Sequence, residues 1–170
     1  MAATLTTLAH TVTELKDAVV TKQTLHQTLQ TKCLSPWSVV GENCLLLALG
    51  DKMNWAAARQ FCSSRGGDLV VFPDANTFAE ILSYINSVNT ENLAVGVWVG
   101  GSDEEVEGVW RWITGEAMPR GPPFWGSTDG YAPEPGNGRA GNCGILWQPD
   151  RYYLHDVICT YDGVPLCQKS

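Results

Sequence analysis

Apolar residues recur at alternating steps of three and four over the first 31 residues, the spacing of a coiled-coil seam. Pro and Gly are absent there, although nine threonines lower the helix propensity. A helix this short and Thr-rich is marginal by itself, so we expect residues 1–31 to form a neck that joins copies of the chain. A frayed leader or a helix docked on its own domain is the alternative. The seam positions are Leu5, Leu8, Val12, Leu15, Val19, Lys22, His26 and Leu29.

Residues 32–170 have the patterns of one α+β domain. Asn54 is a suitable N-cap for a helix that runs to Arg65 and is closed by Gly66. A second helix is expected from Asp74 or Asn76. Its apolar positions follow the i, i+3, i+4, i+7 spacing of a core-facing stripe, formed by Phe78, Ile81, Leu82 and Ile85.

Short runs typical of strands come mostly after these helices, and this order predicts the α+β class rather than a doubly wound parallel sheet. The clearest runs are residues 95–99, 110–113, 143–147, 152–154 and 164–168. Between Gly115 and Asn142 lie five of the nine prolines and seven of the seventeen glycines. A long irregular loop inside a compact domain is commonly functional.

Six cysteines, at positions 33, 44, 62, 143, 159 and 167, include no C-x-x-C pair of the zinc or redox type. An even number of widely spaced cysteines indicates a disulfide framework and therefore an extracellular or luminal protein. Fifteen pairings are compatible with six cysteines, and their spacing does not choose among them.

Charge and composition exclude several classes of function. The formal net charge is −7, and all of it lies beyond residue 31, so binding to nucleic acid or to anionic membranes is not expected. No apolar run is long enough to span a membrane, and no signal peptide is present, so a secreted protein would have lost its targeting segment. Enzymatic motifs such as G-x-S-x-G or a phosphate-binding Gly-Lys loop are also absent, and we expect no enzyme.

Ordered motifs from residue 33 to residue 168 resemble the C-type lectin-like domain family in its long form. They include residues 54–62 ending at Cys62, Gly66-Gly-Asp-Leu-Val70, Val97-Trp-Val-Gly100, Glu134-Pro135, Asn142-Cys143, His155-Asp-Val-Ile-Cys159 and Pro165-Leu-Cys167. The resemblance implies two helices, small antiparallel sheets, a long-loop region, and the disulfides Cys33–Cys44, Cys62–Cys167 and Cys143–Cys159. Residues 101–112 especially resemble secreted invertebrate, crustacean-type members.

In sugar-binding members of that family a calcium ion is held by a Glu-Pro-Asn triplet, an acid two residues before the fourth cysteine, and the Asn-Asp of a Trp-Asn-Asp triplet. This sequence retains two of those five ligands, Glu134 and Asp156, and the resemblance implies a cis bond before Pro135. Gly136, Gly141 and His155 replace the other three. Two carboxylates bind calcium weakly, so we expect a weak or absent calcium site, unless Asn137 and Asn142 contribute.

Each candidate also has an ordinary explanation. Glu134 could be a solvated loop acid, Asp156 an acceptor for loop amides, and His155 a surface imidazole, a glycan donor or a metal ligand. Trp125 is the aromatic residue that best suits packing on a sugar ring, although a tryptophan that anchors the loop is the commoner case. The predicted carbohydrate site comprises Glu134, Asn137, Asn142, His155, Asp156 and Trp125.

The resemblance implies a secreted lectin that binds microbial or cell-surface glycans in innate recognition. The alternative is a protein-binding module of the same fold that has lost calcium-dependent sugar binding. Neck residues with Val at a and Leu at d favour a dimer, whereas relatives with comparable necks are trimers. We expect a homo-oligomer and favour the trimer.

Overall fold

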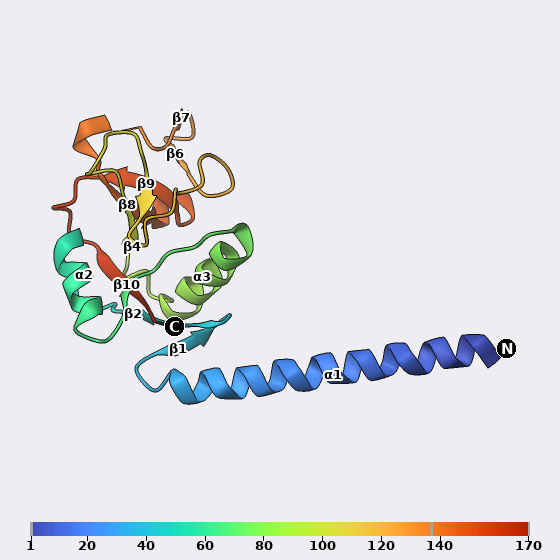
Figure 1. Ribbon diagram of the computed structural model, residues 1–170. Helices are drawn as coiled ribbons and strands as arrows, with labels where there is room; N and C mark the ends of the chain where they lie inside the picture. Colours follow the sequence, from blue (N-terminus) through green and yellow to red (C-terminus); the bar gives the residue numbers. More distant parts are fainter. Residues whose placement is uncertain (1, 137, 170) are drawn as a thin grey trace.

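The computed structural model describes residues 2–136 and 138–169, and all side chains in these ranges except those of residues 2–7, 26, 29, 31 and 32. A long helix, α1 (Ala2–Lys32), precedes the domain and extends away from it (Figure 1). The predicted N-terminal helix is therefore confirmed. Of its expected seam residues, Leu5, His26 and Leu29 lie outside the described side chains.

Two helices lie inside the domain, α2 (Trp55–Ser63) and α3 (Ala75–Val88), and both begin at an expected N-cap. The Asn54 side chain accepts a hydrogen bond from the Ala57 amide at 2.9 Å, and Asp74 accepts bonds from the Asn76 and Thr77 amides. The α3 residues Phe78, Ile81 and Ile85 are buried, as the periodicity predicts.

One sheet of eight strands forms the centre of the domain, with its main strands in the order β1-β2-β10-β4-β8-β9. The α+β class is confirmed, and all strand pairs of this sheet are antiparallel, as expected, except that β4 pairs with β10 in parallel. The last strand inserts between β2 and β4, which run in opposite directions, so it is antiparallel to β2 and parallel to β4. The main strands are β1 (Ser38–Val40), β2 (Asn43–Leu47), β4 (Gly96–Ser102), β8 (Cys143–Trp147), β9 (Tyr153–Val157) and β10 (Val164–Lys169).

Shorter strands extend this framework. Strand β3 (Asp68–Leu69) pairs with β10, and β5 (Arg111–Trp112) pairs with β4. A separate hairpin, β6 (Ser127–Thr128) and β7 (Ala132–Pro133), lies in the long-loop region. Two single-turn 3₁₀ helices, η1 (Gly138–Ala140) and η2 (Gln148–Asp150), flank β8.

Three disulfides tie the domain together and join the expected pairs: Cys33–Cys44, Cys62–Cys167 and Cys143–Cys159. The first lies at the base of α1, the second joins α2 to β10, and the third joins the start of β8 to the segment that follows β9. Figure 1 shows the β6–β7 hairpin at the end of the domain remote from α1. The candidate loop therefore faces away from the helix.

Candidate functional site

The long-loop segment is held against β9 by a short series of backbone hydrogen bonds. The Leu154 amide donates to the Phe124 carbonyl at 2.9 Å, and the Gly126 amide donates to the Leu154 carbonyl at 2.9 Å. One strand position further out, the Glu134 amide donates to the Gly126 carbonyl at 3.0 Å. Glu134, far from β9 in sequence, is thereby placed beside the side chains of that strand.

Strand β9 is longer than the sequence indicated, and this changes the surroundings of two candidates. The expected strand stopped at Leu154, but β9 continues to Val157 because it pairs with β8 along five residues. His155 lies opposite Ile145 and Asp156 opposite Gly144. Both residues are consequently buried, and the interpretation of His155 as a surface imidazole is wrong.

His155 lies between two carboxylates. Its Nδ1 is 3.2 Å from Oε1 of Glu134, and its Nε2 is 2.9 Å from Oδ2 of Asp150. The same Asp150 oxygen also accepts a hydrogen bond from the Ser127 amide at 3.0 Å. A ring with both nitrogens engaged in this way has a fixed orientation, since any rotation breaks one of the two contacts.

Gly126 makes room for this arrangement. A side-chain carbon at position 126 would lie 2.8 Å from Nε2 of His155 and would overlap the Asp150 carboxylate. Any residue with a Cβ would therefore displace the imidazole–carboxylate contact. Neither Asp150 nor Gly126 was among the residues predicted to form the site, because both act through positions that are distant in sequence and carry no local motif.

Glu134 and Asp156 come together, as the resemblance implied. Oε2 of Glu134 and Oδ1 of Asp156 each accept a hydrogen bond from the Gly136 amide at 2.9 Å, and the peptide bond before Pro135 is cis. Glu134 also accepts a hydrogen bond from the Thr128 hydroxyl. Neither acid is a freely solvated loop residue, since both are buried.

These contacts determine the protonation of Glu134. Burial acts to raise the pKa of its carboxyl group, but hydrogen bonding with the Asp156 carboxyl group and the Thr128 hydroxyl, the nearby His155, and the Gly136 amide outweigh burial and lower the pKa below its ordinary value. Glu134 is therefore a carboxylate at neutral pH and serves as a hydrogen-bond acceptor.

A surface cleft of about 490 Å³ opens over these groups. Ser127 and Thr128 supply hydroxyls, and Trp147, Pro149 and Val157 supply apolar surface. The titratable lining residues are four acids and one histidine: Asp129, Glu134, Asp150, Asp156 and His155. Such a lining favours a ligand that donates several hydrogen bonds, because carboxyl oxygens are acceptors and those of Glu134, Asp150 and Asp156 are held in place by backbone amides.

The remaining predicted residues lie elsewhere. Asn142 precedes β8, and its backbone carbonyl accepts a hydrogen bond from the Asp103 amide at 3.3 Å; it is not among the residues that line the cleft. Asn137 lies outside the residues that the structure describes. Trp125 has the contacts of the loop-anchoring tryptophan, the commoner of the two cases considered for it: it is only 5% exposed, packs against Trp110, and donates its Nε1 proton to the Pro119 carbonyl. It anchors the loop, and only a small part of it reaches the surface, where it lines a second cleft.

The residues at the site do not fit a calcium ion of the kind that the resemblance implied. Calcium takes six to eight oxygen ligands, and here Gly136 and Gly141 supply no side-chain oxygen. His155 presents nitrogen in place of a hard oxygen, and its Nδ1 already contacts Glu134. Glu134 and Asp156 remain, and two carboxylates are too few for an ion that takes six to eight oxygens.

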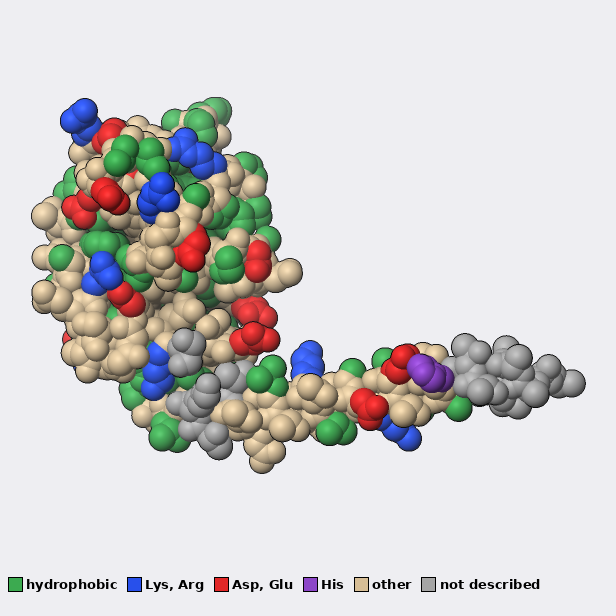
Figure 2. Space-filling view, in the orientation of Figure 1, with side chains coloured by type: hydrophobic (Ala, Val, Ile, Leu, Met, Phe, Trp, Pro, Cys, Tyr) green, Lys and Arg blue, Asp and Glu red, His purple; other side chains and the backbone are tan. Residues whose placement is uncertain are grey.

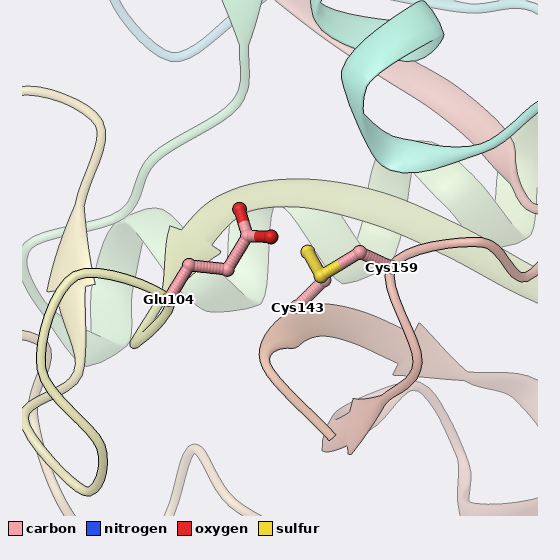
Figure 3. A group of neighbouring side chains, drawn as sticks. All are labelled: Glu104, Cys143 and Cys159. Carbon is pink, nitrogen blue, oxygen red and sulfur yellow. A yellow bond between two sulfur atoms is a disulfide. The ribbon is translucent and has the colours of Figure 1, made fainter. Parts of the chain in front are cut away.

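One other group of possible ligands stands out in the described part of the chain: Glu104, Cys143 and Cys159, whose ligand atoms lie within 4.8 Å of one another. Figure 3 shows the Glu104 carboxylate beside the bond between the two sulfurs. Because both cysteines are in a disulfide, neither can supply the thiolate that a metal would need. This group is not a metal site.

Comparison with known proteins identifies the type of domain. Residues 51–169 match the model of the "Lectin C-type domain" family. A perlucin-like protein from Mytilus galloprovincialis is 25% identical over 135 residues, which are 79% of this chain and 81% of that protein. The galactose-specific lectin nattectin from Thalassophryne nattereri is 25% identical over 138 residues, 81% of this chain and 80% of the relative. Other relatives are longer, and the match spans 61% of human C-type lectin domain family 6 member A.

Solved structures have the same fold. TC14, a C-type lectin from the tunicate Polyandrocarpa misakiensis, superimposes with a TM-score of 0.61 at 25% identity and covers 74% of this chain and 96% of its own. A calcium-independent type II antifreeze protein superimposes with a TM-score of 0.62 at 22% identity, over 81% of this chain and 94% of its own. The likeness to the antifreeze protein concerns the fold alone.

Among the described residues, no helix is long and apolar enough to cross a membrane.

Proposed function

Because the chain belongs to the C-type lectin domain family, a non-enzymatic carbohydrate-binding fold, we propose that it is a secreted lectin whose long-loop cleft binds glycans without calcium. The observation that carries this proposal is the position of His155 between Glu134 and Asp150. The imidazole fixes the Glu134 carboxylate by a direct contact, so the acceptors are held in place by the protein itself.

The cleft suits the hydroxyl groups of a sugar. Glu134, Asp150 and Asp156 are acceptors whose orientation is set by backbone amides and by His155, and a preorganised acceptor loses little freedom when a ligand binds. Relatives that are named as lectins, including one named as galactose-specific, support a glycan ligand. We propose microbial or cell-surface glycans as the class and innate recognition as the role.

A glycan array probed with the purified protein, in calcium and in chelator, tests this function. We expect the same glycans to be bound in both conditions, and we expect His155→Ala to weaken binding because the Glu134 and Asp150 carboxylates lose their common partner. Calcium titration by calorimetry provides the independent measurement. A micromolar calcium affinity, or loss of all binding in chelator, would contradict the calcium-free site.

A protein ligand on the same cleft is the second candidate. The glycines at positions 136 and 141, where sugar-binding members carry ligands, favour it, and a neighbour of the same fold is named as an antifreeze protein rather than a lectin. An array on which the wild-type protein binds no glycan in either condition would support this candidate over the lectin.

Secretion and oligomerisation complete the proposal. Three disulfides suit an oxidising compartment. The exposed apolar side chains of α1, including Leu8, Val12, Leu15 and Val19, would be buried if several copies of the helix associated (Figure 2). Weak single sites would then gain avidity.

Light scattering at tens of micromolar tests the neck. We expect a trimer for the wild-type chain and a monomer for Leu15→Asp, which places a charge in the seam, whereas Asp17→Asn on another face should leave the mass unchanged. A wild-type dimer would contradict the stoichiometry, and a wild-type monomer would contradict the neck itself.

A further inference from the structure

The tip of the β6–β7 hairpin presents one aromatic side chain to solvent. Tyr131 is 93% exposed, more than any other large apolar side chain whose exposure the structure describes. Its amide donates to the Thr128 carbonyl at 3.1 Å across a turn in which Asp129 and Gly130 have φ angles of +54° and +76°. Asp-Gly suits such a turn, so the backbone itself holds Tyr131 outward.

Beside Tyr131 lies a second cleft, of about 480 Å³. Its apolar wall is formed by Pro122, Pro123, Pro133, Tyr131 and Tyr153, together with the small exposed part of Trp125. Proline rings have few internal degrees of freedom, so this wall is largely preformed and loses little entropy when a ligand is bound.

The lining of this second cleft also includes polar residues, which it shares with the cleft over Glu134 and His155, called the acidic cleft from here on. Ser127, Glu134 and Asp150 line both clefts. Residues of the β6–β7 hairpin therefore line two adjacent clefts, one rich in acidic side chains and the other rich in tyrosine and proline.

This combination matches the chemistry of a sugar ring. A pyranose presents C–H groups on one face and hydroxyls around its edge, and aromatic side chains pack against such apolar faces. A wall of carboxylates accepts hydrogen bonds from the hydroxyls. A purely apolar partner would leave Glu134 and Asp150 without ligand contacts, whereas a sugar engages both walls.

We propose that the Tyr131 cleft is a second saccharide subsite, which binds the residue next to the one in the acidic cleft, with Tyr131 packed on its ring. The ligand is then an oligosaccharide of at least two residues. This inference rests on the proposed lectin function and names its ligand class more narrowly. Each cleft alone has the size of a small-molecule site, so two adjacent sugar residues can be accommodated.

The test compares wild type, Tyr131→Ala and Tyr131→Phe by calorimetry, with the best oligosaccharide from the glycan array and with the monosaccharide from its end. Tyr131→Ala should weaken the oligosaccharide about fivefold, because packing against one aromatic ring is lost, and should leave the monosaccharide unchanged. Tyr131→Phe retains the ring face and should bind as the wild type does. Leu93→Ala, a truncation of another exposed apolar side chain, is the matched control.

The outcomes separate the two proposals. If the wild type binds oligosaccharides and Tyr131→Ala binds them equally well, the second subsite is overturned and the lectin function stands. If the wild type binds no glycan, the lectin function fails and the subsite with it. A lower mass of Tyr131→Ala in light scattering would assign Tyr131 to contacts between copies and would also overturn the subsite. Because Tyr131 is almost wholly exposed, none of these results should be confused with unfolding.

Discussion

Helices α1 and α3 both carry apolar residues at helical spacing, although the stripe is much weaker in α1, and these residues are exposed in α1 but buried in α3. In α3, Phe78, Ile81 and Ile85 are buried against the sheet and the loop aromatics. In α1, Leu15 is 61% exposed, and the other described apolar positions of the seam are also exposed. Periodicity therefore predicts which face of a helix will seek burial, but it does not say whether the partner lies in the same chain.

Helix α1 makes few contacts with the domain, and those that hold it lie within the helix and at its base. Threonines at positions 13, 21, 24 and 28 each donate a hydrogen bond to the carbonyl four residues earlier, which satisfies the hydroxyls within the helix. Contacts with β1 and β2, and the disulfide Cys33–Cys44, hold its base. The domain, in contrast, has two clusters of buried side chains and two further disulfides.

The largest expected effect comes from the disulfide that closes the domain. Replacing Cys62 and Cys167 by alanine opens a link across 105 residues, and we expect the free energy of unfolding to fall by about 4–5 kcal/mol in the chain-entropy model. Cys33→Ala with Cys44→Ala opens a link across 11 residues and should cost about 3 kcal/mol. Denaturant unfolding measures both, and equal losses would contradict the dependence on loop length.

Truncating one residue in each helix tests the comparison directly. Ile85→Ala leaves a cavity in the core and should lower the free energy of unfolding of the domain by about 2–5 kcal/mol. Leu15→Ala removes a similar apolar side chain from α1 and should change domain unfolding by less than about 0.5 kcal/mol. Calorimetric unfolding at low protein concentration measures both. A large loss for Leu15→Ala would mean that α1 is part of the domain's own core.

Within the domain, substitution of a buried acid should lower the free energy of unfolding more than substitution of an exposed acid. Glu134→Gln keeps the shape but weakens the contacts with His155, Thr128 and Gly136, so we expect a loss of about 1.5–3 kcal/mol in unfolding and weaker glycan binding. The control is Glu104→Gln, an exposed acid outside the cleft, which should change neither. Equal stability of the two variants would show that the Glu134 network contributes nothing net.

The smallest expected effect is the loss of stability at acidic pH that arises from Glu134. Because the pKa of Glu134 in the folded protein lies below its ordinary value of 4.5, its contribution to stability is fully present above about pH 4.5 and is lost as pH falls through the folded pKa. Wild type should lose stability on acidification more steeply than Glu134→Gln below that pH. Parallel pH profiles of melting temperature for the two proteins would contradict the lowered pKa.

Short stretches of sequence were enough to predict the elements that depend only on neighbouring residues. The cap at Asn54, the start of α3 at Asp74 or Asn76, the buried stripe of α3 and the extent of β8 follow from short stretches of sequence, because capping and residue periodicity are properties of a few consecutive residues. The disulfide pairs followed from the resemblance to a family, since spacing alone left fifteen possibilities.

The chemistry of the site was decided by the tertiary structure. Residues that the sequence separates, Gly126, Glu134, Asp150 and His155, meet because the loop segment pairs with β9 and because β9 continues beside β8 to Val157. That pairing buries His155 between two acids and packs Trp125 into the core. Side-chain types in the sequence determine what each residue can do, but long-range strand pairing decides what it touches, because pairing partners and register depend on contacts that no local pattern records.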